Sequence, residues 1–317
     1  MAATVAQTVR PEVSLLPSGH LRARLRAERI VQAVLGLTAF VSVVVTLAIA
    51  FSLLRPTFEF FREVSFTEFF TSTTWAPLFR PARFGVWPLV TGTALVMLIA
   101  VMVAVPLGIG SAFYLSQYAR PRVRSILKPV LEILAGVPTV VFGFFALNFV
   151  NPELVQRFWP FGQVGTFSAL AAGLVVGIMI LPTMASLAED AMTSVPDALR
   201  QGGLALGASK REVCTKVIFP AALSGIGAAT VLALSRAIGE TTIVLLAAGS
   251  NPQFTLDPGQ AVQTMASFIG FAGIGDLPTG STGYQTIFAV GSLLFLITFL
   301  LNLVSVRVVR RFRQAYE

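Results

Sequence analysis

The stretch Val195–Pro220, VPDALRQGGLALGASKREVCTKVIFP, is a polar and basic interruption between two long apolar runs. Neither Gly162–Ala188 before it nor Val217–Ser235 after it contains a charged residue. Runs of this length can span a bilayer as helices, because an α-helix rises about 1.5 Å per residue. The stretch therefore predicts a loop at one face of a membrane, with a transmembrane helix on each side.

Local signals within this stretch predict its shape. Pro196 is tolerated in the first turn of a helix, so a short helix can begin there. Gly207 allows the left-handed conformation that often ends a helix. Ser209 can cap a following helix, because Glu212 lies three residues later as its partner. We expect a short helix, a turn and a second helix directed back towards the membrane, which is a shape suited to docking another molecule.

The composition is that of a membrane protein. Of the 317 residues, 55% are hydrophobic and 12% are charged, whereas a soluble domain carries about 25% charged residues. Cys214 and His20 are the only cysteine and histidine, so neither an internal disulfide nor a His/Cys metal site is expected. We expect no cofactor in this chain. The net charge of +8 is distributed in a way that favours membrane topology over nucleic-acid binding.

Six apolar runs are long enough to cross a bilayer as helices. Near the end of the first run, Ala48–Ala50 resembles a signal-peptidase site, so a cleaved signal is an alternative. The run is too long for a typical signal, and we expect an uncleaved anchor. The predicted fold is an all-α, polytopic transmembrane helical bundle with spans at Ile30–Leu54, Leu89–Ala119, Pro129–Val150, Gly162–Ala188, Val217–Gly249 and Gly283–Val306.

Two further segments lie next to these spans. Arg55–Trp87 is rich in aromatic residues and too charged to cross the bilayer, so we expect an interfacial loop with amphipathic helices whose Phe side chains contact lipid or the interface. Ala261–Gly275 is apolar but too short to cross. We expect an external interfacial helix there, with a re-entrant segment as the alternative.

The basic residues predict the orientation of the chain. Of the 23 Lys and Arg residues, 17 fall in the two ends of the chain, in the Arg120–Lys128 turn and in the loop at 189–216. Because positively charged loops stay in the cytoplasm, both termini and this loop are expected there. The predicted domains are a cytoplasmic tail at 1–29, a transmembrane domain at 30–306 that includes the loop at 189–216, and a basic cytoplasmic tail at 307–317.

Charged residues also occur inside or at the end of predicted spans. Arg236 and Glu240 interrupt the fifth span and, being four residues apart, are expected to share one helix face. An ionisable residue inside a span is by default a functional hypothesis. We expect Arg236 to line the route of an anion, with Glu240 orienting it and offsetting its charge and Thr241 beside them. The alternative is a structural ion pair, or one facing water near the outer end. Glu189 and Asp190 end the fourth span and are expected to help position the loop at 189–216.

No sequence motif for ATP hydrolysis or nucleophilic catalysis is present. The phosphate-cradling pattern G-x-x-x-x-G-K-[ST] is absent, and a single histidine leaves no Ser/His/Asp or Cys/His set. The chain is therefore not expected to be an enzyme. If it transports a solute using ATP, another chain must hydrolyse the ATP.

The loop resembles the cytoplasmic motif of ABC importer permeases, E-A-A, three residues, G, nine residues, I-x-L-P. Gln201-Gly202-Gly203 stands at the E-A-A place, and Gly207 and Pro220 stand at the glycine and proline places. Gln201 replaces the glutamate of the motif, so an ion pair through that position is not expected. The resemblance implies a coupling helix that sits in a groove of an ATPase subunit. The implied coupling residues are Gln201, Gly202, Gly203, Ala205, Gly207, Ala208, Ser209 and Pro220.

Other motifs resemble the phosphate-specific ABC importer permeases of the bacterial inner membrane, and the PstC-type subunit more closely than the PstA-type. They imply inorganic phosphate as substrate, alternating access as mechanism, and as partners a PstA-like second permease, two ATPase subunits, an external phosphate-binding protein and the lipid membrane, with no nucleic acid. Alternatives are a permease for another oxyanion such as sulfate or molybdate, a secondary transporter or channel, and a scaffold without transport. The motifs are Gly92-Thr93, Pro106–Gly110, Leu134–Gly143, Ile178–Pro182 and Ser235–Thr242.

Overall fold

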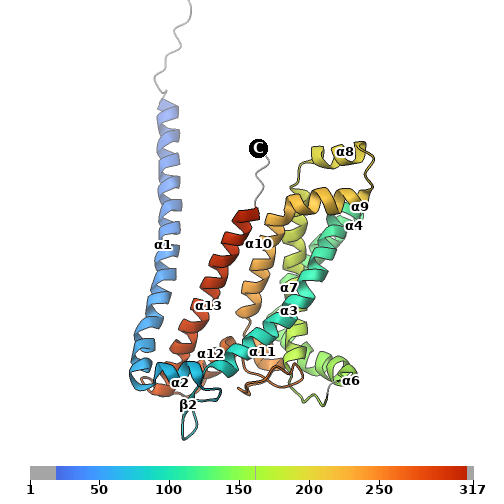
Figure 1. The fold of residues 1–317 in the computed structure, drawn as a ribbon. Coiled ribbons are helices and arrows are strands. Elements are labelled where there is room, and N and C mark those ends of the chain that lie inside the picture. Colours follow the sequence, from blue (N-terminus) through green and yellow to red (C-terminus); the bar gives the residue numbers. More distant parts are fainter. Residues whose placement is uncertain (1–18, 161, 313–317) are drawn as a thin grey trace, which may run out of the picture. The chain divides into compact units, whose positions relative to one another are not determined.

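The computed structural model describes residues 19–160 and 162–312, and these residues are mainly helical (Figure 1). The chain divides inside the first helix, α1 (Gly19–Glu63), so that residues 19–52 form one unit and residues 53–312 form a second unit. The first unit is a single stretch of helix whose apolar side chains are mainly exposed. Residues 1–18 of the predicted N-terminal tail and residues 313–317 of the predicted C-terminal tail lie outside the described residues.

The second unit carries the remaining elements. The two strands pair in an antiparallel hairpin, with Trp75 opposite Phe84. The π-helical segments are η1 (Tyr114–Tyr118), η2 (Ala146–Val155) and η3 (Cys214–Ile218). The other elements are α2 (Phe66–Thr71), β1 (Trp75–Ala76), β2 (Arg83–Phe84), α3 (Trp87–Phe113), α4 (Pro121–Ala135), α5 (Thr139–Phe145), α6 (Gln156–Phe158), α7 (Ala169–Thr193), α8 (Asp197–Ala205), α9 (Lys210–Val213), α10 (Phe219–Ile238), α11 (Thr242–Ala247), α12 (Met265–Gly273) and α13 (Thr282–Phe312).

The described chain contains five helices that are long and apolar enough to cross a membrane, and a sixth span if the bent pair α4 and α5 is counted as one. This confirms the all-α, polytopic fold predicted from the apolar runs. Several bounds differ from the prediction, because helices continue past the apolar runs. Helix α1 continues through Pro56 to Glu63, and α7 begins at Ala169 but includes Glu189 and Asp190.

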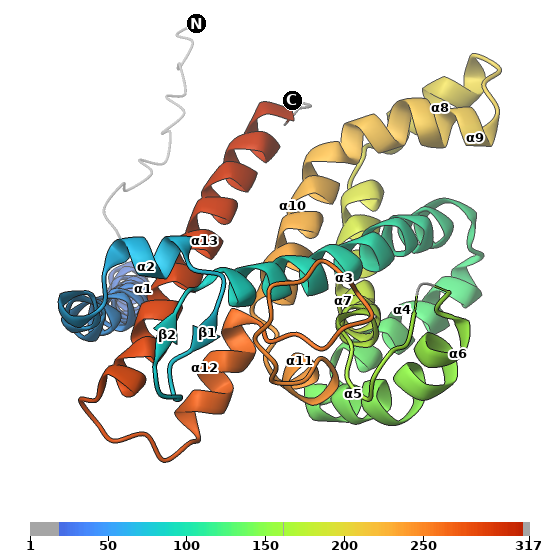
Figure 2. The same cartoon turned by 60° about the horizontal axis from the view of Figure 1, so that its bottom comes forward.

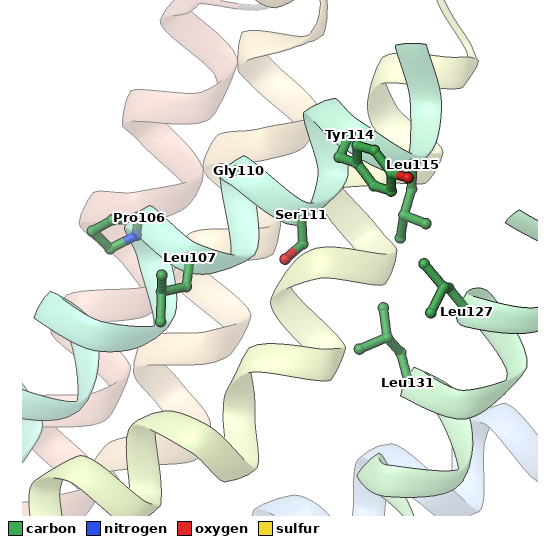
Figure 3. A pocket seen from close by; sticks show the side chains of 8 residues that line it. All are labelled: Pro106, Leu107, Gly110, Ser111, Tyr114, Leu115, Leu127 and Leu131. Atoms are coloured by element: carbon green, nitrogen blue, oxygen red, sulfur yellow. The ribbon is translucent and has the colours of Figure 1, made fainter. Parts of the chain in front are cut away.

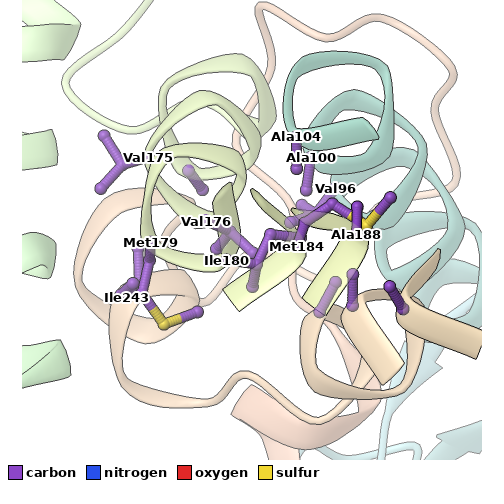
Figure 4. Packing of buried hydrophobic residues seen from close by; sticks show 14 of the residues in the cluster. Val96, Ala100, Ala104, Val175, Val176, Met179, Ile180, Met184, Ala188 and Ile243 are labelled. Carbon is purple, nitrogen blue, oxygen red and sulfur yellow. The ribbon is translucent and has the colours of Figure 1, made fainter. Parts of the chain in front are cut away.

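The centre of the second unit is the packing of α3 against α7 (Figure 4). The facing side chains are small or aliphatic, among them Ala100, Val176 and Ile180. At Gly173 an added Cβ would lie 2.6 Å from Cβ of Ile99, so the two backbones approach too closely for any larger residue. Small residues allow such an approach inside a membrane, where packing rather than hydrophobic burial holds helices together.

The third and fifth predicted spans are broken. Helices α4 and α5 meet at a bend of 89°. Pro138 directly precedes α5, and it ends the hydrogen-bonding pattern of α4 because it has no N–H and restricts the residue before it. In the fifth span, α10 ends at Ile238 and α11 begins only at Thr242. The expectation of one continuous segment at Val217–Gly249 was wrong.

Helices α2 and α12 and the β-hairpin lie at the end of the second unit opposite α8 and α9 (Figures 1 and 2). Phe60, Phe69, Trp75 and Phe268 belong to a buried cluster at this end, which we call the aromatic cap. The ring centroids of Trp75 and Phe268 are 5.0 Å apart, edge to face. The prediction that Phe side chains of this segment contact lipid or the interface was therefore wrong for Phe60 and Phe69, which are buried. They pack against elements that follow far later in the chain.

Helix α12 belongs to the same cap. It has nine residues, which is too short to cross a bilayer, as expected. Met265, Ser267 and Phe268 are buried against other parts of the protein, so α12 is a packed element rather than a helix lying on an interface. Its start is fixed by Thr264, whose side chain caps the N–H of Ser267, and by the hydroxyl of Thr93, which accepts the N–H of Met265 at 3.0 Å.

Candidate functional site

The loop between α7 and α10 has the predicted helix, turn and helix. Helix α8 is followed by Gly207, whose φ of 82° is the expected left-handed conformation. Ser209 then caps α9, with Oε2 of Glu212 accepting the backbone N–H of Ser209 at 3.0 Å. Both cap predictions are confirmed. The local shape of the loop is therefore determined by Gly207, which ends α8, and by the Ser209–Glu212 capping box, which starts α9.

Two leucines at the end of α8 are exposed beside exposed polar and basic residues of this loop. Leu206 is 90% exposed and Leu204 is 47% exposed, and neither was among the predicted coupling residues. Sequence reasoning missed them because leucines between two spans suggest burial. Both side chains are accessible to another molecule. Of the predicted residues, Gly203 and Ala208 are partly buried, and Gln201, Gly202, Ala205, Gly207, Ser209 and Pro220 are exposed.

The inner face of the loop rests on the end of α3. Val213 and Cys214 are buried, and Val213 leaves so little room that a Cβ at Gly203 would lie 3.0 Å from it. Nζ of Lys210 lies 4.9 Å from the ring centroid of Tyr118 in η1. The rings of Phe113 and Phe219 are stacked at 5.4 Å. The loop therefore contacts η1, at the end of α3, and leads through η3 into α10.

A cluster of four charged side chains joins α4 to the end of α7. The carboxylate of Glu189 is fully buried and accepts hydrogen bonds from Arg124 and from Nζ of Lys128, the latter at 2.7 Å. Lys128 also donates to Asp190 at 2.5 Å. Thr193, at the end of α7, donates to Glu189 at 3.0 Å. We call these four charged side chains the ion-pair joint; it fixes the segment of α7 that leads into α8.

Arg236 lies in the last turn of α10, about 25 Å from Phe219 at 1.5 Å rise per residue. It is exposed, and its Nη1 donates to Oγ1 of Thr183 in α7 at 3.2 Å. Within residues 19–160 and 162–312, no carboxylate lies within ion-pair distance of Arg236. Its partner Thr183 follows Pro182 and could not be identified from spacing, since the two residues are 53 positions apart.

Arg236 and Glu240 were expected to share one helix face, and this was wrong. Helix α10 ends at Ile238, before Glu240. Oε1 of Glu240 accepts the backbone N–H groups of Thr242 and Ile243, at 3.0 and 3.1 Å. Glu240 is buried and caps the start of α11. Thr241 stands at the break, where its hydroxyl donates to the carbonyl of Gly239 at 3.2 Å. The structure thus brings Arg236, Glu240 and Thr241 to one break but gives Arg236 and Glu240 different contacts.

The described residues contain no group of three or more His, Cys, Asp or Glu side chains that could hold a metal ion. The acidic side chains of the ion-pair joint bind Arg124 and Lys128 instead. The site therefore offers a charged guanidinium, hydroxyl groups and a loop with two exposed leucines.

Comparisons with known proteins agree with this arrangement. Residues 104–314 match the family model for the binding-protein-dependent transport system inner membrane component. The probable ABC transporter permease protein YqgH of Bacillus subtilis is 35% identical over 238 residues, which cover 75% of each chain. The phosphate transport system permease protein PstC 2 of Mycobacterium tuberculosis is 31% identical over 302 residues, which cover 89% of this chain and 91% of that protein.

Solved structures show the same fold. The permease of a bacterial alginate ABC transporter, in complex with an alginate pentasaccharide-bound periplasmic protein, superposes with a TM-score of 0.64 over 93% of this chain and 99% of the other, at 14% identity. A chain of the inward-facing MetNI methionine ABC transporter gives a TM-score of 0.53 over 73% of this chain and 95% of the other, at 19% identity. This chain belongs to the binding-protein-dependent transport system inner membrane component family and is a multi-pass ABC importer permease whose relatives include PstC proteins.

Proposed function

We propose that this chain forms part of the pathway of an ATP-driven phosphate importer, and that Arg236 binds the phosphate as it passes. The observation that carries the proposal is the exposed guanidinium of Arg236, whose neighbours in the described residues include a hydroxyl but no paired carboxylate. A charge beside apolar helices is expensive unless it is compensated or has a function. The PstC relatives support phosphate as the compensating anion.

The geometry suits an oxyanion. A guanidinium presents a planar fork of N–H donors that matches two oxygens of a phosphate, and only Nη1 is used by Thr183. Glu240 keeps Oε1 on the backbone of α11, so it holds the break in shape rather than pairing with Arg236. Thr183 and Thr241 supply hydroxyl groups close to the break. In this proposal Arg236 binds the anion, and Glu240 positions the backbone around it.

The second part of the proposal concerns the energy source. The loop from α8 to α9 docks on an ATPase subunit through Leu204 and Leu206, which are exposed at its outer face. The loop and both termini then lie in the cytoplasm, and ATP is hydrolysed by the partner. A PstA-like permease would complete the pathway, and an external phosphate-binding protein would deliver the anion at the opposite face. Closure of two ATPase subunits would pull the coupling helices together and open the pathway outward.

Uptake of radiolabelled phosphate into proteoliposomes, with the cognate partner subunits and internal ATP, tests the substrate. We expect phosphate to be taken up in preference to sulfate and molybdate, and Arg236→Ala to abolish uptake while the complex still assembles. Equal or faster uptake of sulfate or molybdate would make the chain a permease for that oxyanion instead. Uptake that continues without the ATPase subunits would indicate a secondary transporter or channel.

Binding of the ATPase subunits to purified permease tests the dock. We expect the double substitution Leu204→Ser and Leu206→Ser to weaken binding and to lower phosphate-dependent ATP hydrolysis, because apolar area is lost from the contact. Leu256→Ser is a matched control, since Leu256 is 77% exposed in the loop between α11 and α12, on the far side of the unit. Unchanged ATPase binding by the double variant would exclude this dock.

A further inference from the structure

A groove separates α3 from α4, as Figure 3 shows. It has a volume of about 510 Å³ and is lined almost entirely by apolar side chains, including Leu107 and Leu115 from α3 and η1 and Leu127 and Leu131 from α4. Helix α4 packs against α7 instead of filling this space, and none of its residues is buried. At Gly110, on the wall of the groove, an added Cβ would meet no atom within 4 Å.

A second cavity, whose lining is more polar, adjoins the groove at Leu115. This cavity has a volume of about 440 Å³ and shares Leu115 with the first. Its lining includes Arg124, Lys128 and Ser116, and the carboxylate side chain of Glu132. The groove is therefore apolar, and the cavity next to it carries basic side chains.

Near the second cavity, some of the basic side chains form no ion pair within the described residues. Arg124 and Lys128 bind Glu189 and Asp190 of the ion-pair joint, which accounts for two positive charges. Arg120 and Arg122, at the start of α4, are exposed, and in the part of the chain that the structure describes neither forms an ion pair. Arg120 and Arg122 flank Pro121, which lines the second cavity, and Glu132 is the one carboxylate among the lining residues, so two unpaired cations stand beside one carboxylate at this end.

We propose that this groove binds an anionic phospholipid, with one acyl chain between α3 and α4 and the headgroup phosphate beside Arg120 and Arg122. Basic pockets between transmembrane helices at the cytoplasmic side hold anionic headgroups through the same attraction. The apolar length of the groove fits an acyl chain, and the charge at its end selects the headgroup. A second permease subunit is the other candidate occupant, but its contact would not require free arginines at one end. The proposal rests on the proposed orientation only in placing the headgroup at the cytoplasmic face.

The test is native mass spectrometry of the full transporter, titrated with phosphatidylglycerol or phosphatidylcholine in the absence of phosphate and ATP. We expect the first phosphatidylglycerol to bind more tightly than phosphatidylcholine. In the double variant Arg120→Gln and Arg122→Gln, affinity for phosphatidylglycerol should fall by about fivefold for each arginine, while affinity for phosphatidylcholine stays unchanged. Equal binding of the two lipids by the unmodified transporter would overturn the proposal.

A second variant blocks the groove itself. Gly110→Leu places a side chain in open space, so it should reduce binding of both lipids without displacing protein atoms. Gly273→Leu is the matched control, because a Cβ there also meets nothing within 4 Å, at the end of α12. If Gly110→Leu instead separates the two permease subunits and leaves lipid binding intact, the groove is a protein interface and the lipid proposal fails. Loss of phosphate uptake is measured separately and bears only on the transport proposal.

Discussion

Two charged regions of this membrane domain are built in opposite ways. In the ion-pair joint between α4 and α7, Arg124 and Lys128 face two carboxylates, one of them fully buried. At the end of α10, Arg236 donates to the hydroxyl of Thr183 and, among the described residues, pairs with no carboxylate. A compensated cluster holds two helices in one arrangement, whereas an uncompensated cation remains available to a mobile anion. The difference separates an arginine that pairs with carboxylates from one that we propose binds an anion within the same bundle.

The largest effect is expected from removing the buried carboxylate of the joint. Glu189→Ala leaves Arg124 and Lys128 without their buried partner and should lower the free energy of unfolding by about 3 kcal/mol, at the low end for a buried pair because both cations are partly exposed. The measurement is the thermal midpoint of the assembled transporter. Glu59→Ala, which breaks the exposed pair with Arg55, is the control and should change stability by about 0–1 kcal/mol. Equal effects of the two substitutions would contradict a special role for the joint.

The second prediction makes the two regions alike. Thr183→Glu gives Arg236 a carboxylate partner and should reduce phosphate uptake by about tenfold or more, because the anion must then displace an ion pair. Thr183→Gln is the matched control, since it has the same size without the charge. Uptake rates over a range of phosphate concentrations measure the effect. If both variants transport equally well, the free charge of Arg236 is not what the pathway uses.

The third prediction concerns the cap at the break. Glu240→Ala removes the acceptor for Thr242 and Ile243 and should destabilise α11 by about 1 kcal/mol. Glu240→Gln keeps an oxygen acceptor and should retain most stability and uptake. Hydrogen exchange of the backbone of α11 reports the loss of the cap. Loss of uptake in Glu240→Gln with α11 unchanged would show that the negative charge itself is required.

The smallest effect is expected from removing the hydroxyl of Thr183 without adding a charge. Thr183→Val preserves the shape of the side chain but removes the acceptor for Nη1 of Arg236, which should weaken phosphate uptake by about 0.5 kcal/mol, or roughly twofold. Thr183→Ser should behave like the unmodified protein, because it keeps the hydroxyl. Competition between the two variants and the unmodified protein at limiting phosphate would resolve so small a difference. A stronger loss than that of Thr183→Glu would show that the hydroxyl, and not the charge balance, controls the site.

The loop between α7 and α10 was predictable because its shape is decided by neighbours in sequence. Gly207, Ser209 and Glu212 act within one or two turns of backbone, so their spacing alone specifies the caps. The apolar runs likewise predicted the spanning helices. The exposure of Leu206 was not predictable from sequence. An apolar residue close to a membrane span is expected to be buried, and only the structure shows which atoms surround it.

The remaining features depend on contacts between distant residues. Arg124 and Glu189 are 65 positions apart, and their pairing follows from the packing of α4 on α7. The helix breaks after Ile238, and the side chain of Glu240 caps α11 instead of continuing α10. The four-residue spacing from Arg236 suggested a continuous helix and gave no sign of this break. An aromatic-rich segment has the same composition whether its rings contact lipid or pack inside the protein. The sequence therefore could not show that Phe60 and Phe69 are buried in the aromatic cap. The functional roles of Arg236, Glu240 and Thr241 stay predictions.

The aromatic cap also constrains the order of assembly. Thr57, near the end of α1, hydrogen-bonds to Ser292 of α13 across 235 residues. Phe60 belongs to the same buried cluster as Phe268 of α12 and Val290 of α13, which leave the ribosome much later. During synthesis the early half of the cap therefore exposes its rings until the final span has been inserted. Quality control that recognises exposed aromatic surface could then distinguish a truncated chain from a finished one, because only a complete chain can close the cap.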